Sequence, residues 1–266
     1  MEINFSKYHG NGNDFVVIDN RSNTFPAGDN ELVRRLCDRN FGIGGDGLML
    51  MEKKDGYDFH MRYFNSDGRE ATMCGNGGRC MIHFAYRLGV VKHTVVFSGI
   101  DGRHEGSISG QKTVRLRMKD VTAIEQDGDA YIIDTGSPHY VVFTDDVDDM
   151  DVVARGREVR YSDKFSPGGI NVNFVCVRKN GIHIRTYERG VENETLACGT
   201  GSVAAAICAR LKSPLSDHTV KVYTSGGLLE VSFKTRSKSI FTDIWLTGPA
   251  QFVFEGTIDI SNLIRL

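Results

Sequence analysis

Two cysteines lie in the same short pattern in different halves of the chain. Residues 70–77 read Glu-Ala-Thr-Met-Cys-Gly-Asn-Gly, and residues 194–201 read Glu-Thr-Leu-Ala-Cys-Gly-Thr-Gly. Both fit Glu-x-x-x-Cys-Gly-x-Gly, and Cys74 and Cys198 are separated by nearly half the chain. Each pattern follows a strand-like segment and leads into an apolar segment. Its recurrence predicts one reactive loop in each of two similar lobes.

A cysteine directly before a helix can act as an acid and as a base. Unpaired backbone N–H groups and the positive end of the helix dipole lower a thiol pKa from about 8.5 toward neutrality. The glycines let a ligand approach the backbone, whose N–H groups can hold a carboxylate and stabilise developing negative charge. With one thiol on each face of a bound amino acid, a thiolate removes the α-proton and a thiol returns one from the other side. The pattern therefore predicts inversion of an amino-acid stereocentre.

The other four cysteines carry no such pattern, and no two cysteines form a Cys-x-x-Cys pair. Without a secretion signal they are expected to be thiols rather than disulfides. We expect all four to be small buried side chains. They are Cys37, Cys80, Cys176 and Cys208.

Composition excludes several classes of protein. The 266 residues include 32 Lys and Arg against 34 Asp and Glu, so no nucleic acid or anionic membrane is expected as a partner. The N-terminus has no apolar core of signal-peptide length, and no apolar run approaches the ~20 residues of a membrane span. We expect a cytoplasmic protein that binds a small polar ligand.

Strand-like segments with apolar–polar alternation dominate the chain, which favours an α+β fold with mostly antiparallel sheets. Four helices are predicted, at residues 30–39, 77–88, 148–157 and 201–211. The acidic run at 145–151 is interpreted as a helix start rather than a metal site.

The repeat also predicts the domain division. Residues 1–119 form the expected N-terminal lobe with Cys74, and residues 120–255 form the C-terminal lobe with Cys198. The tail, 256–266, is expected to pack back onto the first lobe.

Further motifs run along the chain. They are Lys-Tyr-His-Gly-Asn-Gly-Asn-Asp-Phe at 7–15, Gly-Ile-Gly-Gly-Asp-Gly at 42–47, Phe-Asn-Ser-Asp-Gly at 64–68, Cys-Gly-Asn-Gly-Gly-Arg-Cys at 74–80, Pro-His at 138–139, Asn-Val-Asn-Phe at 171–174 and Glu-Arg-Gly at 188–190. With the two cysteine patterns, the sequence resembles the diaminopimelate epimerase family. These isomerases interconvert LL- and meso-diaminopimelate, in lysine and peptidoglycan precursor biosynthesis, without pyridoxal phosphate.

The resemblance implies two pseudo-symmetric lobes, each a sheet wrapped round a central helix, with the active site between them. It implies no cofactor and no metal, diaminopimelate as the small-molecule substrate, and a homodimer. Cys74 and Cys198 would transfer protons, supported by His139 and Glu188. The matching substrate-binding positions are Asn13, Asn65, Gly75, Asn76, Asn171, Glu188, Arg189, Gly199 and Thr200.

Most of these roles have a chemical reason. Gly75, Asn76, Gly199 and Thr200 would hold the reacting carboxylate at the helix N-termini. A second, distal amino-acid head needs an arginine for its carboxylate, and a carboxylate with amide oxygens for its ammonium group. The Glu188–Arg189 pair offers both charges side by side.

Three features depart from the common family pattern. Ser137 stands before Pro-His where many members have asparagine, and Gly47 stands where some have glutamine. The link at 191–195 is one residue longer than the commonest form. These changes concern recognition of the distal head and leave the two-thiol chemistry intact.

Other functions stay open at this point. A proline racemase-like enzyme shares two thiol lobes, but its one-headed substrate would leave the Glu188–Arg189 pair idle. A thiol hydrolase could pair a cysteine with His139, but it has no use for a duplicated cysteine motif. A non-catalytic amino-acid-binding protein would bind without exchanging the α-proton.

Overall fold

The computed structural model describes residues 1–110, 112–212 and 219–264, and the chain forms two compact units. Unit 1 comprises Met1–Leu116 and Pro249–Leu266, and unit 2 comprises Arg117–Gly248. The sequence placed the first boundary after residue 119 and began the returning tail at residue 256. The last two residues of that tail lie outside the described residues.

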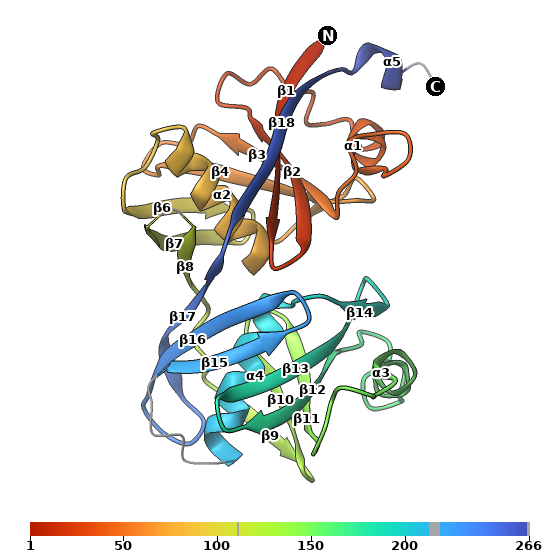
Figure 1. Cartoon of the computed structure of the whole chain (residues 1–266), viewed down its shortest axis with the longest axis vertical. Coiled ribbons are helices and arrows are strands. Elements are labelled where there is room, and N and C mark those ends of the chain that lie inside the picture. The colour runs from red at the N-terminus through yellow and green to blue at the C-terminus, as the bar shows by residue number, and fades with distance from the viewer. Residues whose placement is uncertain (111, 213–218, 265–266) are drawn as a thin grey trace. The chain divides into compact units, whose positions relative to one another are not determined.

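The described residues of unit 1 form a mixed sheet with three helices (Figure 1). Its elements are β1 (Glu2–Gly10), β2 (Asn13–Asp19), α1 (Asn30–Cys37), β3 (Gly47–Glu52), β4 (Phe59–Asn65), β5 (Glu70–Ala71), α2 (Gly75–Arg87), β6 (Thr94–Gly99), β7 (Gly102–Ser109), β8 (Thr113–Arg117), β18 (Gln251–Asp259) and α5 (Ser261–Ile264). The strands pair in the order β18-β1-β2-β3-β4-β6-β7-β8, and β5 pairs with the end of β4. The β2–β3 and β4–β6 pairs are parallel, and the others are antiparallel.

Unit 2 repeats this arrangement. Its elements are β9 (Ile124–Asp127), β10 (Ala130–Asp134), β11 (Pro138–Phe143), α3 (Val152–Arg160), β12 (Asn171–Arg178), β13 (Gly181–Glu188), β14 (Asn193–Thr195), α4 (Gly199–Lys212), β15 (Thr219–Thr224), β16 (Gly227–Thr235) and β17 (Phe241–Pro249). The order is β9-β10-β11-β12-β13-β15-β16-β17, and β14 pairs with the end of β13. Again two pairs, β11–β12 and β13–β15, are parallel.

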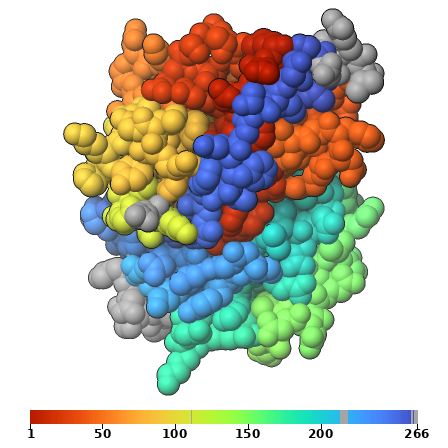
Figure 2. All heavy atoms as spheres, turned by 45° about the horizontal axis from the view of Figure 1, so that its top comes forward, coloured from red at the N-terminus to blue at the C-terminus, as the bar shows by residue number. Residues whose placement is uncertain are grey.

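The two units therefore share one topology, and the repeat seen in the cysteine motifs extends to the whole fold. The counterpart of β9 in unit 1 is β18, which comes from the other end of the chain and pairs antiparallel with β1. Figure 2 shows this blue C-terminal strand lying against the red N-terminal segment. The predicted α+β fold of two similar lobes, each with a mostly antiparallel sheet round a central helix, is confirmed.

One helix of each unit is buried on every side. Every residue of α2 from Gly75 to Ala85 is buried, and so are Gly199 and the α4 residues from Gly201 to Ala209. Small residues allow the sheet to close round each helix, since a Cβ on Gly77 would lie 3.0 Å from the Met49 sulfur. Both helices begin two residues earlier than predicted, directly after the cysteine. The glycines that suggested a turn are already helical.

The outer helices pack on the other face of each sheet. Asp29 caps α1 through the Leu32 N–H, and Asp151 caps α3 through the Ala154 N–H. The predicted start of α3 at residue 148 is wrong, because Asp146 and Asp148 instead bind Arg178 ahead of the helix. In the described part of the chain, no helix is both long enough and apolar enough to cross a membrane.

Candidate active site

Cys74 is the N-cap residue of α2, with extended backbone angles φ −91° and ψ 133°. Its side chain does not cap the helix, and Sγ lies 3.7 Å from Asn13 Oδ1 instead. Helix geometry leaves the first-turn N–H groups, among them those of Gly75 and Asn76, without intrahelical acceptors. The loop thus presents a half-buried thiol beside N–H groups that suit a carboxylate.

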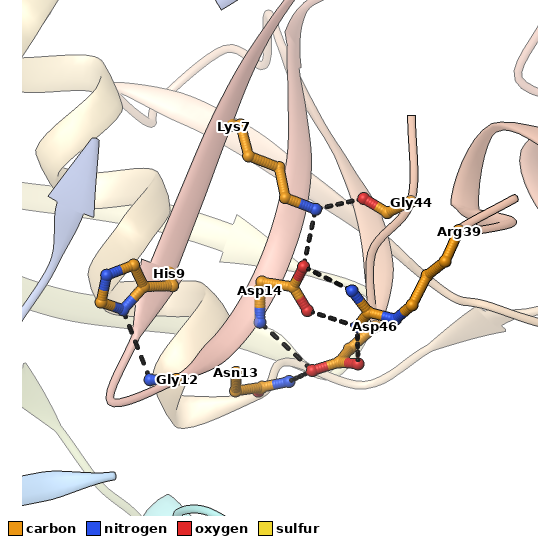
Figure 3. A network of polar contacts seen from close by, with 8 residues as sticks. All are labelled: Lys7, His9, Gly12, Asn13, Asp14, Arg39, Gly44 and Asp46. Carbon is orange, nitrogen blue, oxygen red and sulfur yellow. Dashed lines mark hydrogen bonds and ion pairs between the residues drawn. The ribbon is translucent and has the colours of Figure 1, made fainter. Parts of the chain in front are cut away.

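The orientation of the Asn13 amide is fixed by an ionic network (Figure 3). Asn13 Nδ2 donates to Asp46 Oδ2 at 2.6 Å, so Oδ1 must face Cys74. Arg39 bridges Asp46 and Asp14, and Lys7 pairs with Asp14 at 2.7 Å. Burial alone would raise the pKa of Asp14, but the hydrogen bonds and charges of Arg39 and Lys7 lower it to about 2. The Asp14 carboxylate is therefore ionised in ordinary buffers, and the network holds the Asn13 amide oxygen toward the thiol.

A buried guanidinium lies below the same loop. Arg79 is fully buried in α2, and it donates to Gly75 O at 3.1 Å, Asn76 Oδ1 at 3.0 Å and Asn11 Oδ1 at 2.8 Å. Because Arg79 can only donate, the Asn76 Nδ2 must face Asn13 Oδ1, which it reaches at 3.2 Å. The Arg79 charge also interacts with the Cys74 thiol, and a nearby cation favours the thiolate form.

Cys198 precedes α4 in the same way, but its contacts differ. The thiol is buried, 7% exposed, and Sγ accepts from the Gly201 N–H at 3.4 Å. Thr200 Oγ1 lies 3.5 Å from Sγ and 2.9 Å from His139 Nε2. The hydroxyl thus connects the thiol to the histidine.

The direction of these hydrogen bonds follows from Asn173. Its Nδ2 donates to Tyr140 O at 3.2 Å and lies 3.0 Å from His139 Nδ1, so Nδ1 must accept. Complete burial lowers the pKa of His139 to about 3, which keeps the ring neutral. Its one proton is then on Nε2, which donates to Thr200 and leaves the threonine hydroxyl to donate to the Cys198 sulfur. Two hydrogen bonds therefore connect His139 to Cys198 through the Thr200 hydroxyl.

A second group of predicted residues gathers at the ends of β12 and β13. Asn171 Oδ1 accepts from the Arg189 N–H at 2.9 Å, and Glu188 Oε2 accepts from Thr195 Oγ1 at 2.9 Å. Asn171 is also the register partner of His139 on β11, so this group adjoins the Cys198 group. The Glu188 carboxylate thus lies beside the second thiol loop, while the Arg189 guanidinium lies against the carbonyls of Gly168 and Gly169.

The structure explains two of the departures. The Ser137 hydroxyl accepts from Asn171 Nδ2 at 2.8 Å and so holds a predicted binding residue in place. A Cβ on Gly47 would lie 2.5 Å from Phe64 O and 2.6 Å from the Tyr63 ring, so no larger side chain fits there. Asn65, exposed at the end of β4, lies opposite Gly47 in the strand register.

Several supporting residues were not singled out from the sequence. They are Arg39, Asp46, Arg79, Asn173 and Glu192. Asp46, Arg79 and Asn173 lie inside the motifs named above and Glu192 inside the longer link, so those positions carried a signal. Arg39 contacts Asp14, which is distant in the sequence, and no local pattern records that contact.

The remaining cysteines are buried as predicted, at 4% exposure or less. Burial raises the pKa of Cys37 and Cys80 to about 12, so they are inert thiols near neutral pH. Among the described residues, no group of three or more His, Cys, Asp or Glu side chains could hold a metal ion.

Solved structures show the same fold. A phenazine biosynthesis protein of the PhzF family from Bacillus anthracis has a TM-score of 0.76 at 17% identity, covering 98% of this chain and all of that chain. A probable proline racemase from Agrobacterium radiobacter has a TM-score of 0.68 at 15% identity, covering 97% of this chain and 93% of that one. At these identities the likeness concerns the fold alone.

Sequence relatives are much closer. Diaminopimelate epimerase of Flavobacterium psychrophilum is 47% identical over 253 residues, covering 95% of this chain and 98% of the relative. The enzyme of Chlorobaculum tepidum is 41% identical over 260 residues, covering 94% and 98%. The family model for diaminopimelate epimerase matches residues 5–124 and 131–253. The chain therefore belongs to the diaminopimelate epimerase family.

Proposed function

We propose that this chain is an isomerase that converts LL-diaminopimelate to meso-diaminopimelate with two cysteines and no pyridoxal phosphate. The observation that carries the proposal is the duplicated thiol position: Cys74 and Cys198 each lie at the start of the buried central helix of topologically matched units. Membership of the family supplies the substrate.

In the proposed reaction one thiolate takes the α-proton, and the C–H electron pair moves into the α-carboxylate. The other thiol then gives its proton to the opposite face of the carbon, and the two sulfurs end with exchanged protonation states. An amino-acid α-proton is a very weak acid, so the negative charge needs stabilisation at the moment it forms. The N–H groups at Gly75, Asn76, Gly199 and Thr200 would hold the carboxylate and provide it.

Recognition of the second head would use Asn171 with its neighbours Glu188 and Arg189, and the unit 1 residues Asn13 and Asn65. Arg189 would bind the distal carboxylate, and Glu188 with the amides of Asn13, Asn65 and Asn171 would bind the distal ammonium group. A substrate with one head would leave these charges unused. This distinguishes the proposed activity from proline racemase-like chemistry.

Membership of the family also supports a proposal for the cellular setting. The reaction belongs to lysine and diaminopimelate biosynthesis, and we place it in the cytoplasm, where thiols stay reduced. The family resemblance also supports a homodimer, which gel filtration with light scattering tests.

Isotope exchange tests the function directly. Incubated in D2O with reductant and without pyridoxal phosphate or metal, the protein should place deuterium at an α-carbon of diaminopimelate. Cys74→Ala and Cys198→Ala should each abolish isomerisation. The absence of exchange between about pH 6 and 9, or near-native turnover by either variant, would contradict the proposal.

A further inference from the structure

The turn that carries Glu188 and Arg189 is closed differently from its counterpart in unit 1. Between β4 and β5, residues 65–69 close through the backbone: Asn65 N donates to Arg69 O, and Gly68 N donates to Asn65 O, both at 3.0 Å. Between β13 and β14, residues 188–193 include one more residue. Here the Glu192 N–H bonds to Glu188 O at 2.8 Å, and Glu192 has a left-handed φ of 57°.

The Glu192 side chain ties this longer turn to the rest of unit 2. Its carboxylate accepts from Tyr161 Oη at 2.9 Å, Tyr187 Oη at 3.0 Å and the Gly190 N–H at 3.0 Å, and it pairs with Arg160 at 3.2 Å. Burial would raise the Glu192 pKa, but these hydrogen bonds and the Arg160 charge lower it overall. The carboxylate is therefore ionised, and it joins the end of α3, the end of β13 and the turn itself.

Arg160 extends this connection to the Arg189 side chain. A Cβ on Gly169 would lie 1.6 Å from Arg160 Nη1, so the guanidinium lies directly against the Gly169 backbone. The carbonyls of Gly168 and Gly169 accept from Arg189 Nη1 at 3.3 and 3.4 Å. Glu192 thus holds Arg160, which supports the segment that orients Arg189.

We propose that Glu192 is the positioning residue for the Glu188–Arg189 pair and sets the affinity of the enzyme for the distal head of its substrate. The inference rests on the proposed function. A carboxylate is needed because all four partners donate hydrogen bonds to it, and an amide in its place would turn an NH2 group toward donors. Glu192 does not touch the reacting carbon, so it should affect binding more than proton transfer.

Steady-state kinetics on LL-diaminopimelate test the binding effect. Glu192→Gln should raise KM about tenfold and change kcat less than about twofold, the pattern of lost ground-state binding. Tyr161→Phe removes one of these donors at a residue that is 53% exposed, and it should raise KM about two- to threefold. The matched control is Asp127→Asn, because Asp127 also accepts from a tyrosine, Tyr140, and pairs with a lysine, Lys164. It should leave KM unchanged.

Trypsin cleavage tests the positioning itself, independently of activity. The rate of cutting between Arg189 and Gly190, followed by mass spectrometry, should rise about tenfold in Glu192→Gln and stay unchanged in Asp127→Asn. An inactive wild type would count against the proposed function, and the cleavage rates would still decide the positioning. With an active wild type, a rise in KM without faster cleavage, or faster cleavage without a rise in KM, would overturn the inference.

Discussion

The two cysteine loops have the same place in the fold but different surroundings. Around Cys74 the support is ionic: Asp46 orients Asn13, and the buried Arg79 lies beneath the loop. Around Cys198 the support is neutral, and the sulfur faces the Gly201 N–H and a threonine hydroxyl. The shared topology determines the position of each thiol, while the groups that surround the two thiols differ.

The strand register shows which residues of unit 1 and unit 2 occupy corresponding positions. Phe15 and Gly47 are partners across β2–β3, and His139 and Asn171 are partners across β11–β12. Next along each sheet stand Asn65 and Glu188, at the ends of β4 and β13. In the helices, Arg79 corresponds to Val203, five residues after each cysteine. The charged residues Glu188 and Arg189 thus occupy the positions of the neutral Asn65 and Ser66 in unit 1.

The largest expected difference between the units concerns this helix position. Arg79→Met would remove one hydrogen-bond donor from each of four oxygens, those of Gly75, Asn76, Asn11 and Pro249. The free energy of unfolding, measured in urea, should fall by about 3–5 kcal/mol. The matched Val203→Ala should cost only about 2 kcal/mol, mostly for lost apolar burial. If Arg79→Met cost less than Val203→Ala, the ionic account of unit 1 would be wrong.

The threonine in the first turn of α4 should matter next. Thr200→Val removes the hydroxyl that links His139 to Cys198, so kcat should fall about 10- to 100-fold. Thr200→Ser keeps the hydroxyl and should retain most activity. Equal kcat values for Thr200→Val and Thr200→Ser would show that His139 does not support Cys198 through the threonine hydroxyl.

Acid should affect the units in different pH ranges. The folded pKa of His139, about 3, is below its unfolded value near 6.5, so the unfolded chain binds the proton first. Stability therefore falls as the pH drops below about 6.5, by up to about 1.4 kcal/mol per pH unit from this residue. The depressed pKa of Asp14, about 2, adds stability that is lost only as the pH falls from about 3.8 through 2.

Urea unfolding between about pH 7 and 5 tests this order. The free energy of unfolding should depend less steeply on pH in His139→Gln than in the wild type. Over the lower part of this range, the difference in slope should correspond to about one proton. An unchanged slope would mean that His139 is not held neutral in the folded chain.

The smallest effect is expected at Asp46. Asp46→Asn no longer forces the Asn13 amide into one orientation, so KM should rise about three- to fivefold. Asp38→Asn is the control, because the Asp38 side chain accepts from the nearby backbone N–H groups of Asn40 and Phe41. Equal KM values for Asp46→Asn and Asp38→Asn would show that Asp46 does not contribute to substrate binding.

The sequence predicted the α+β class, the repeat and the position of both thiols, because the cysteine motif is local and occurs twice. It missed β18 as a strand, since Gln251–Asp259 becomes one by pairing with β1 at the other end of the chain. It started α2 and α4 too late, because the glycines after each cysteine have a turn-like composition although the buried helix already includes them.

Much of the supporting structure also could not be predicted. Glu192 acquires its role from Tyr161 and Arg160 at the end of α3, and Asn13 acquires its orientation from Asp46, which lies well beyond it in the sequence. The burial of Arg79 contradicts the usual preference of arginine for the surface, and only the surrounding oxygens account for it.

The central claim is that two different thiols act on the two faces of one carbon. The most direct test is a short incubation of LL-diaminopimelate in D2O, with deuterium measured separately in the product and in the recovered substrate. The account predicts that the inverted carbon of the meso product carries deuterium from the second thiol, while recovered LL-diaminopimelate keeps its proton. Equal deuterium in both isomers, or a product that retains the original proton, would contradict it.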